Sequence, residues 1–239
     1  MKKLTCVGII PARGGSKSIP KKNIALLCAK PLICYTIESA KKSKLLDSFI
    51  VSTDDPETAD VAKSFGADVP FLRPKEFSTD TATDLGFLKH ALIWLRENRN
   101  LTPDVIVNLR PTGPFRGPED IDAVLATMQK TGCDSVRTLS KPNQNPFKMW
   151  YVDESNFKMT PLLPTKYFDS VGIDVPRQLL PQNVYWTNAL VDATKTKFIL
   201  EQDKIYGPDI RAIIVSGNKT IDIDGPEELA YAEYIMRKK

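Results

Sequence analysis

Histidine is nearly absent from this chain: His90 is the only one among 239 residues. Without a second histidine, a histidine-based zinc site and a Ser-His-Asp triad are both disfavoured. His90 itself lies in an apolar, helix-like stretch, where we expect a structural role. The four cysteines, Cys6, Cys28, Cys34 and Cys133, include no C-x-x-C pair. This usage predicts free, mostly buried thiols in a reducing compartment, the cytoplasm, and no disulfide framework.

Long hydrophobic segments are also missing. No uncharged apolar run approaches the roughly 18 residues that cross a bilayer, so we expect no membrane partner. The N-terminus superficially resembles a signal peptide, because Lys2 and Lys3 precede the apolar stretch Leu4–Ile10. That stretch is short, however, and Arg13 and Lys17 follow where a small-residue cleavage site should lie. The segment therefore predicts a buried β-strand.

Acidic residues are missing from the first 37 positions, which hold seven basic residues; the first carboxylate is Glu38. The whole chain has 33 Lys and Arg against 29 Asp and Glu, a net charge of +4, so the remaining sequence is slightly acidic. The positive excess is therefore confined to the N-terminal segment. It indicates one local anion site, and it argues against a surface that wraps a long polyanion.

The remaining composition, 42% hydrophobic and 26% charged, is that of a globular protein, and the length suits a single domain over residues 1–239. Continuous apolar runs predict strands at Leu4–Ile10, Phe49–Thr53, Val105–Leu109, Val184–Val191 and Arg211–Val215. Helical periodicity predicts helices at Leu32–Lys44, Pro56–Phe65, Thr83–Asn98, Asp120–Lys130, Thr194–Glu201 and from Pro226 onward. This alternation predicts an α/β fold with a mostly parallel sheet.

The alternation breaks after Ser140. Residues 141–183 are rich in Pro, Asn, Gln and aromatic residues, with one hairpin expected around Trp150–Met159. We interpret this stretch as an insertion, an arm that contacts a partner subunit. Within it, Arg177 is either a carboxylate clamp or part of a local ion pair.

The loop Pro11–Asn23 follows the first strand and contains most of the N-terminal basic residues. It matches neither the P-loop pattern nor G-x-G-x-x-G. Its glycines nevertheless allow backbone N–H groups to approach an anion, and Arg13, Lys17 and Lys22 supply positive charge at the carboxyl end of a strand. A solvated basic loop is the alternative. The absence of acidic residues favours an anion site.

The segment Thr220–Glu228 contains a pair of aspartates. If the segment is a strand, Asp222 and Asp224 point to the same face and suit Mg²⁺, which prefers one or two carboxylates together with substrate phosphates. Asp224 followed by Glu227 is also a capping pattern for the last helix. From these residues alone, metal binding and capping are equally supported.

Two further segments leave alternatives open. Asn108–Arg116, with two arginines and two prolines, is either a rigid basic rim of a site or a structural turn. Leu72–Pro74 together with Asp80–Thr83 forms either a ligand loop or the start of a helix that Asp80 or Thr81 caps.

Taken together, these segments resemble the acylneuraminate cytidylyltransferases, the CMP-sialic acid synthetases and their relatives for legionaminic and pseudaminic acids. The resemblance covers nearly the whole chain. It is carried by I-P-A-R-G-G-S-K-S-I-P-K-K-N at residues 10–23, V-S-T-D at 51–54, L-R-P at 72–74, D-T-A-T at 80–83 and I-D-I-D at 221–224. It implies a three-layer, Rossmann-like nucleotidyltransferase fold with an inserted dimerisation arm.

The resemblance also implies roles for individual residues. Catalytic residues that neutralise the triphosphate are Arg13, Lys17 and Lys22. Nucleotide-binding residues are Ala12, Arg13, Gly14, Asn23, Arg73, Thr81 and Thr83. Residues for the acceptor are Arg110, Lys148, Arg177, Gln178 and Asn188, of which those in the arm act across a homodimer interface. Mg²⁺ would be the cofactor, held by Asp222 and Asp224.

Two segments depart from the family's pattern. Members usually have Q-P-T-S-P-L-R where this chain has R-P-T-G-P-F-R, so that Arg110 replaces a glutamine. The usual R-P-N-G-A-I-Y is replaced by W-T-N-A-L-V-D at Trp186–Asp192, in which Asn188 persists. Both departures fall on the acceptor side, whereas the nucleotide motifs are intact.

The resemblance implies transfer of CMP from CTP to a sialic-acid-like keto-acid sugar, with release of pyrophosphate. An eight-carbon or otherwise atypical keto-acid is an alternative acceptor. A nucleotide-sugar glycosyltransferase with Asp54 and Asp55 as its metal pair is a second enzymatic hypothesis. An RNA-binding module is a third, but the basic N-terminus lacks interleaved aromatic residues apart from Tyr35, so we expect no nucleic-acid partner.

Overall fold

The computed structural model describes residues 3–163 and 176–238. The chain divides into two compact units, one made of Met1–Leu139 and Thr187–Lys239 and the other of Ser140–Trp186. Of the expected arm at 141–183, residues 164–175 lie outside the described residues.

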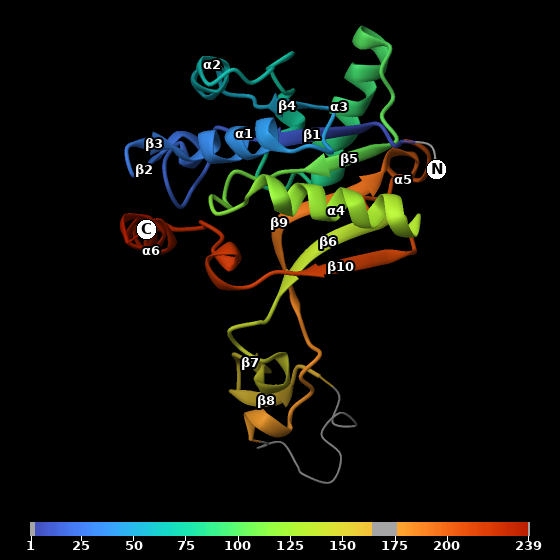
Figure 1. The fold of residues 1–239 in the computed structure, drawn as a ribbon. Coiled ribbons are helices and arrows are strands. Elements are labelled where there is room, and N and C mark those ends of the chain that lie inside the picture. Colours follow the sequence, from blue (N-terminus) through green and yellow to red (C-terminus); the bar gives the residue numbers. More distant parts are fainter. Residues whose placement is uncertain (1–2, 164–175, 239) are drawn as a thin grey trace. The chain divides into compact units, whose positions relative to one another are not determined.

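The first unit is built on a six-stranded sheet with the strand order β10-β6-β9-β5-β1-β4 (Figure 1). Its strands are β1 (Cys6–Pro11), β4 (Ser48–Ser52), β5 (Val105–Asn108), β6 (Ser135–Ser140), β9 (Trp186–Lys195) and β10 (Ile210–Ile214). The pairs β1–β4, β1–β5 and β6–β10 are parallel, and β5–β9 is antiparallel. The predicted α/β class with a mostly parallel sheet is confirmed.

The chain changes direction across the sheet at β1. It passes from β1 to β4 on one side and then crosses back to β5 on the other, so that Ile9 pairs with both Ile50 and Asn108. Such a switch point leaves a crevice outside the carboxyl ends of the two strands, because the connecting segments lead away in opposite directions. The loops after β1 and β5 border that crevice.

Helices cover both faces of the sheet, which gives three layers (Figure 1). The helices are α1 (Leu32–Lys42), α2 (Pro56–Ser64), α3 (Asp84–Arg99), α4 (Pro118–Thr131), α5 (Thr196–Gln202) and α6 (Pro226–Arg237). Successive residues of β1 point to opposite faces. Cys6 and Ile10 pack with α1, α2 and α4 in one apolar cluster, whereas Val7 and Ile9 pack with α3 and α5 in another.

A third apolar cluster joins the two ends of the chain. It contains Ile19 from the basic loop, Leu27 and Leu32, together with Ile223 and Ala232 from the C-terminal segment. Leu27 lies in a short hairpin of β2 (Leu26–Leu27) and β3 (Lys30–Pro31). Packing in this cluster brings the segment that contains the aspartate pair next to the basic loop.

The second unit contains the expected hairpin, formed by β7 (Trp150–Asp153) and β8 (Lys158–Pro161). It also has a small apolar cluster in which Phe147 and Leu180 are buried. Among its described residues are also two short 3₁₀ turns, η3 (Pro146–Lys148) and η6 (Arg177–Leu179). Three further 3₁₀ turns, η1 (Lys22–Ile24), η2 (Lys75–Phe77) and η7 (Gly217–Thr220), belong to the first unit.

Several local predictions were wrong. The chain at Ile221–Asp224 is not a strand, because its backbone hydrogen bonds, from the N–H of Ile221 to Asn218 (3.1 Å) and from the N–H of Ile223 to Thr112 (2.8 Å), form no ladder. The terminal helix is capped at Gly225, whose N–H donates to Glu228 at 2.8 Å, so Asp224 and Glu227 do not form the cap.

Two predictions about the rest of the first unit also need correction. The strand β6 had not been predicted, and β9 extends further toward the C-terminus than the predicted Val184–Val191. The helix α3 is capped at Thr83, without a side-chain cap, so neither Asp80 nor Thr81 has the expected capping role.

The structure also bears on three features that are scarce or missing in the sequence: long apolar helices, paired cysteines and histidine. None of the helices within residues 3–163 and 176–238 combines the length and apolarity that a membrane crossing requires. The four cysteines are free, and all except Cys28 are buried. His90 packs against the rings of Phe71 (4.6 Å between centroids) and Phe77 (5.5 Å), and burial lowers its pKa.

Ala189 generates a prediction about stability. Its φ is +53°, in the left-handed region, which costs a residue with a side chain about 1–2 kcal/mol. Glycine removes this strain but loses about 0.4–1 kcal/mol through greater freedom of the unfolded chain. We therefore expect Ala189→Gly to raise the free energy of unfolding in urea by about 0.5–1 kcal/mol.

Ala193→Gly is the matched control, since Ala193 is buried in the same strand and is not among the residues with positive φ. It should lower the free energy of unfolding. Equal effects of the two substitutions would contradict the strain at Ala189.

Candidate active site

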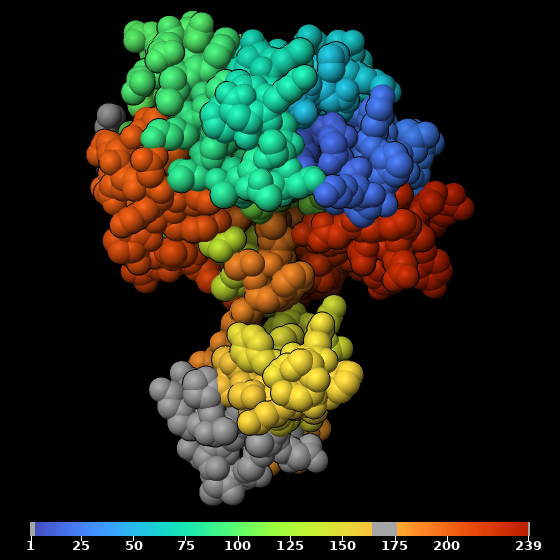
Figure 2. Space-filling view, turned by 180° about the vertical axis from the view of Figure 1, so that it is seen from behind, coloured from blue at the N-terminus to red at the C-terminus, as the bar shows by residue number. Residues whose placement is uncertain are grey.

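A cavity of about 460 Å³ opens at the carboxyl ends of β1 and β5, where the switch point predicts a ligand site. Its lining is Pro11, Arg13, Ser16, Lys17, Ser18, Lys22, Asn23, Arg73, Phe77, Thr79, Asp80, Ala82, Asp84, Phe87, Arg110, Pro111, Thr112 and Asp224. In Figure 2 the blue N-terminal segments of the first unit lie between teal segments and the red C-terminal ones. All three segments contribute to this lining.

Seven of the residues predicted for the site line this cavity: Arg13, Lys17, Lys22, Asn23, Arg73, Arg110 and Asp224. They come from four segments far apart in the sequence. The predicted basic loop and the predicted metal segment therefore meet at one place.

Asp80 pairs with both leading cations of the basic loop. Its carboxylate lies 2.8 Å from Nη1 of Arg13 and 2.5 Å from Nζ of Lys17. The hydrogen bonds from Lys17 and then Arg13 lower the pKa of Asp80. The Asp80 carboxylate is thus paired with two cations that could also bind a phosphate group.

Lys22 connects the basic loop to the aspartate pair. Its side chain is only 15% exposed, and Nζ lies 3.3 Å from Oδ1 of Asp224, which is exposed. Asp222 is mostly buried, and burial raises its pKa, with the charge of Asp224 adding to the effect and a hydrogen bond from Thr112 opposing it. Of the two carboxylates, Asp224 lines the cavity and Asp222 does not.

This donor set fits a divalent cation that completes its coordination with substrate oxygens. Within residues 3–163 and 176–238, no cluster of three or more His, Cys, Asp or Glu side chains is arranged to hold an ion. Mg²⁺ does not require one, since it is usually bound through one or two carboxylates, substrate phosphates and water. Asp222 and Asp224 match that requirement.

The start of the basic loop is held by hydrogen bonds within the protein. The N–H of Ala12 donates to Ser52 O at 2.9 Å, and the N–H of Gly14 donates to Oδ1 of Asp54 at 3.0 Å. A Cβ on Gly14 would lie 2.7 Å from Cβ of Asp55, so glycine is needed for the close approach of these two segments. Neither Ala12 nor Gly14 lines the cavity, and we interpret both as residues that position the loop.

Asp54 and Asp55 do not form a metal pair in this arrangement. Asp54 accepts the Gly14 N–H, and Asp55 caps α2 by accepting the N–H of Thr58 (3.0 Å) and its hydroxyl (2.6 Å). Neither carboxylate lines the cavity. The geometry therefore gives no support to the glycosyltransferase hypothesis.

Arg73 stabilises one wall of the cavity through its contacts with Ser52, Phe77 and Phe87. It is buried, its Nε donates to the hydroxyl of Ser52 at 3.0 Å, and Nη2 donates to the carbonyl of the same residue. Nη1 reaches the carbonyl of Phe77 at 3.4 Å, and the guanidinium lies 4.8 Å from the centre of the Phe87 ring. Burial lowers its pKa to about 10. Arg73 thus holds two aromatic residues at the cavity.

Thr81 and Thr83 do not line the cavity, although their neighbours Thr79 and Ala82 do. Phe77 and Phe87 were not predicted, and no sequence signal distinguished them from core residues. Asp80 was predicted to belong either to a ligand loop or to a helix cap, and the structure places it in the cavity lining.

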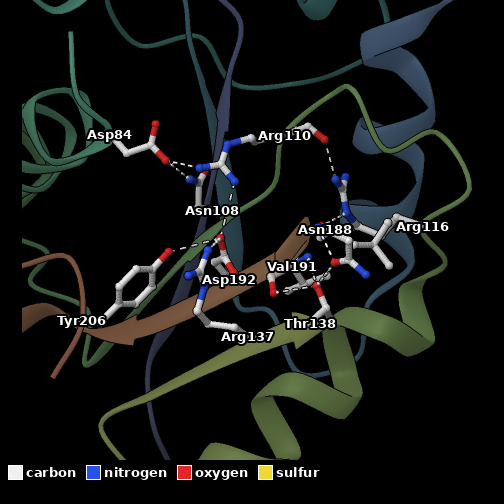
Figure 3. A network of polar contacts seen from close by, with 11 residues as sticks. Asp84, Asn108, Arg110, Arg116, Arg137, Thr138, Asn188, Val191, Asp192 and Tyr206 are labelled. Atoms are coloured by element: carbon white, nitrogen blue, oxygen red, sulfur yellow. Dashed lines mark hydrogen bonds and ion pairs between the residues drawn. The ribbon is translucent and has the colours of Figure 1, made fainter. Parts of the chain in front are cut away.

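A polar network fixes Arg110 at the end of β5 (Figure 3). Its Nη2 donates to Asp84, and Nη1 lies 3.4 Å from Oδ2 of Asp192. Arg137 binds Asp192 through Nε (2.9 Å) and Nη2 (3.3 Å), and the hydroxyl of Tyr206 lies 3.3 Å from the same carboxylate. We call Arg110, Asp84, Asp192, Arg137 and Tyr206 the Arg110 network.

Asn188 does not line the cavity. It is buried, its Oδ1 accepts from the hydroxyl of Thr138 (2.8 Å) and the N–H of Leu190 (3.2 Å), and its Nδ2 has no partner among the described residues. The structure thus shows Asn188 as a brace between β6 and β9 (Figure 3).

Lys148, Arg177 and Gln178 belong to the second unit. Arg177 lines a separate cavity of about 230 Å³ within that unit, together with Lys141, Pro142, Asn145, Pro181, Gln182 and Val184. Lys148 and Gln178 are exposed. Their predicted role with the acceptor remains a prediction.

A three-layer α/β fold with a cavity at the switch point of its sheet places the protein in the Rossmann-like class of α/β folds. Solved structures agree with the fold. One is CMP:2-keto-3-deoxy-manno-octonic acid synthetase complexed with CTP (TM-score 0.70, 18% identity, covering 98% of this chain and 99% of that one). Another is 4-diphosphocytidyl-2C-methyl-D-erythritol synthase from Anaerococcus prevotii (TM-score 0.66, 12% identity, 99% and 100%).

The sequence comparisons identify the family. The sequence profile described as "Cytidylyltransferase" matches residues 7–153, and the chain belongs to that family. CMP-N,N'-diacetyllegionaminic acid synthase of Legionella pneumophila is 32% identical over 96% of this chain and 95% of that protein. Pseudaminic acid cytidylyltransferase of Campylobacter jejuni is 29% identical over the same shares. N-acylneuraminate cytidylyltransferase of Escherichia coli is 32% identical over 98% of this chain and 52% of that protein.

The contacts of Asp80 generate a prediction about anion binding. If its carboxylate competes with phosphate for Arg13 and Lys17, Asp80→Asn should bind inorganic tripolyphosphate about threefold more tightly, as befits the loss of two exposed ion pairs. Isothermal titration calorimetry measures the dissociation constant. Asp60→Asn, which removes an exposed carboxylate outside the cavity lining, should leave it unchanged. Weaker binding by Asp80→Asn would instead show that Asp80 supports the anion site.

Proposed function

We propose that the protein transfers CMP from CTP to a sialic-acid-like keto-acid sugar and releases pyrophosphate. The observation that carries this proposal is the meeting of Arg13, Lys17 and Lys22 with Asp224 around one cavity at the switch point of the sheet. The cytidylyltransferase profile and the names of the similar enzymes support CTP as the donor and a keto-acid sugar as the acceptor.

In the proposed reaction, the anomeric hydroxyl oxygen of the sugar attacks the α-phosphorus of CTP. A P–O bond forms, the bond from the α-phosphorus to the β-phosphate oxygen breaks, pyrophosphate leaves with the electron pair, and the hydroxyl proton is released to water. Such transfers depend on charge neutralisation and in-line positioning. Arg13, Lys17 and Lys22 would neutralise the triphosphate and the departing pyrophosphate.

Asp222 and Asp224 would hold Mg²⁺. The ion would neutralise phosphate charge and polarise the phosphate oxygens when bound. Lys22 already lies 3.3 Å from Asp224, so it would contact the same phosphates from the loop side. Asn23 donates to the carbonyl of Arg13 at 2.9 Å and keeps the loop in place. Arg73 would hold the wall against which the nucleoside lies.

On the acceptor side, Arg110 faces the cavity, and we propose that Asn188 supports this side from behind.

We further propose that the protein is a homodimer in which Lys148, Arg177 and Gln178 of one subunit complete the acceptor site of the other. Exposed large apolar side chains in the second unit support an interface: Met149, Trp150, Tyr151, Val152, Phe157, Met159, Leu179 and Trp186. The free cysteines fit a reducing cytoplasm.

A pyrophosphate-release panel tests the function. The purified protein is incubated with Mg²⁺ and CTP, UTP, ATP or GTP, each with N-acetylneuraminate, N,N'-diacetyllegionaminic acid, pseudaminic acid or 2-keto-3-deoxy-manno-octonic acid. We expect release with CTP and at least one of these acids, and loss of release in EDTA that Mg²⁺ restores. Release with UTP, ATP or GTP but never with CTP would contradict the donor. A best rate with the eight-carbon acid would support the atypical acceptor.

Lys17 offers a sharper test of the triphosphate site. Removing one charge-stabilising group typically costs roughly 10²–10³ in rate. We therefore expect Lys17→Ala to lower kcat by about that factor while its thermal unfolding stays unchanged, because the side chain is exposed. Lys21→Ala is the matched control in the same loop: Lys21 pairs with Glu57 and does not line the cavity, so its kcat should stay near that of the wild type. Normal turnover by Lys17→Ala would remove Lys17 from the mechanism.

A further inference from the structure

Arg110 and Asp192, two members of the Arg110 network, contact each other across distant parts of the chain. Nη1 of Arg110 lies 3.4 Å from Oδ2 of Asp192, although 82 positions separate them in the sequence. The two residues are therefore parts of one structural unit.

Asp192 is fixed from behind by groups that do not face the cavity. It is only 4% exposed, and a buried carboxylate is costly unless it is paired and hydrogen-bonded. Arg137 supplies two hydrogen bonds, Tyr206 supplies a third, and the guanidinium of Arg137 stacks 4.4 Å from the Tyr206 ring centre. Asp192 thus has a fixed position from which it holds Arg110.

Arg110 is held at the cavity from two further directions. Asp84 at the start of α3 binds Nη2, and Asp84 is itself fixed by Nδ2 of Asn108 at 3.2 Å. Arg116, which is fully buried, donates to the main-chain carbonyl of Arg110. The Arg110 side chain is 27% exposed and lines the cavity, and a guanidinium has five N–H donors. Two of these donors bind the aspartates, so others remain available to a ligand.

The charges of the network cancel. Arg110 and Arg137 carry two positive charges, and Asp84 and Asp192 carry two negative ones. Burial alone would lower the pKa of Arg110, but the two aspartates raise it above its ordinary value, so the guanidinium stays charged. The Arg110 guanidinium is therefore paired with two carboxylates of its own, whereas Arg13 and Lys17 share one.

We propose that Arg110 donates hydrogen bonds to an uncharged oxygen of the acceptor, a hydroxyl or an N-acyl carbonyl, and that Asp192 is the positioning residue that sets this selectivity. The inference rests on the proposed function. It identifies which chemical feature of the keto-acid sugar this end of the cavity recognises: a neutral hydrogen-bond acceptor and not a second carboxylate.

The test uses the full-length protein, CTP and the keto-acid of the panel that gives the highest kcat/KM. The KM values for both substrates are measured for the wild type, Arg110→Gln, Asp192→Asn and the double variant. We expect either single substitution to raise the acceptor KM by about tenfold, the loss expected for a charge-assisted hydrogen bond, while the KM for CTP changes less than about twofold. The double variant should be no weaker than Arg110→Gln, because both substitutions remove the same interaction.

Two further measurements separate positioning from loss of structure. Tyr206→Phe removes only one hydrogen bond to Asp192 and should raise the acceptor KM by about twofold to threefold. Arg110→Gln should raise the acceptor KM by the same factor at 50 and 500 mM NaCl, since a contact with a neutral oxygen is not screened. Arg99→Gln and Asp68→Asn, which break an exposed ion pair of 2.5 Å, are the controls and should leave both KM values unchanged.

Each result supports or overturns the inference. Additive single effects, an unchanged acceptor KM in Asp192→Asn, or equal rises in both KM values would overturn it while the proposed function stands. A factor for Arg110→Gln that shrinks at high salt would show that Arg110 binds an anionic group instead. Wild-type protein that releases no pyrophosphate with any acid would contradict the proposed function and this inference with it.

Discussion

The placement of β1 between β4 and β5 is the constraint on which the site depends. Because the chain leaves β1 toward one neighbour and later returns to the other, no connecting segment covers the carboxyl ends of β1 and β5. The loop after β1 carries the cations, and the loop after β5 carries Arg110. The C-terminal segment joins them because Ile223 is buried in the same apolar cluster as Ile19. The position of the cavity thus follows from the topology of the sheet and does not depend on the chemistry of particular side chains.

The cavity has two electrostatically different ends. At one end, Arg13 is half-buried and Lys17 exposed, and both pair with Asp80 on a neighbouring loop. At the other, Arg110 is fixed by two carboxylates that are fixed in turn by Asn108, Arg137 and Tyr206. Cations that share a single carboxylate suit a ligand that brings its own negative charge, whereas a guanidinium held by two carboxylates suits recognition by shape and hydrogen-bond direction.

The strands and helices of the first unit were largely predictable, because buried parallel strands are continuous apolar runs and their helices have strong periodicity. The strand β6 was missed since its sequence, S-V-R-T-L-S, is neither a continuous apolar run nor a strict alternation: its two apolar residues, Val136 and Leu139, are three positions apart. Ile221–Asp224 does alternate, apolar with acidic, which is why it resembled a strand. Local pattern cannot show that the N–H of Ile223 donates to Thr112 in a loop and that no neighbouring strand pairs with the segment.

The candidate site was predictable where one segment carries its signal, as in the loop that contains Arg13, Lys17 and Lys22. It was not predictable where the signal lies in a contact between distant segments. Asp80 resembled a helix cap, and only the fold brings it to Arg13, 67 positions away. Asp192 resembled an ordinary strand residue. Pairings of this kind depend on topology, which residue type and spacing do not contain.

The position of Asp80 also affects how quickly a bound phosphate product can leave the cavity. A carboxylate that pairs with Arg13 and Lys17 whenever no phosphate is bound lowers the free energy of the empty state. It thereby weakens the hold on every phosphate ligand, including a leaving product that carries several negative charges. A site made only of unpaired cations would retain such a product for long periods. Asp80 therefore lowers the affinity of the site for phosphate ligands and favours faster release of the product.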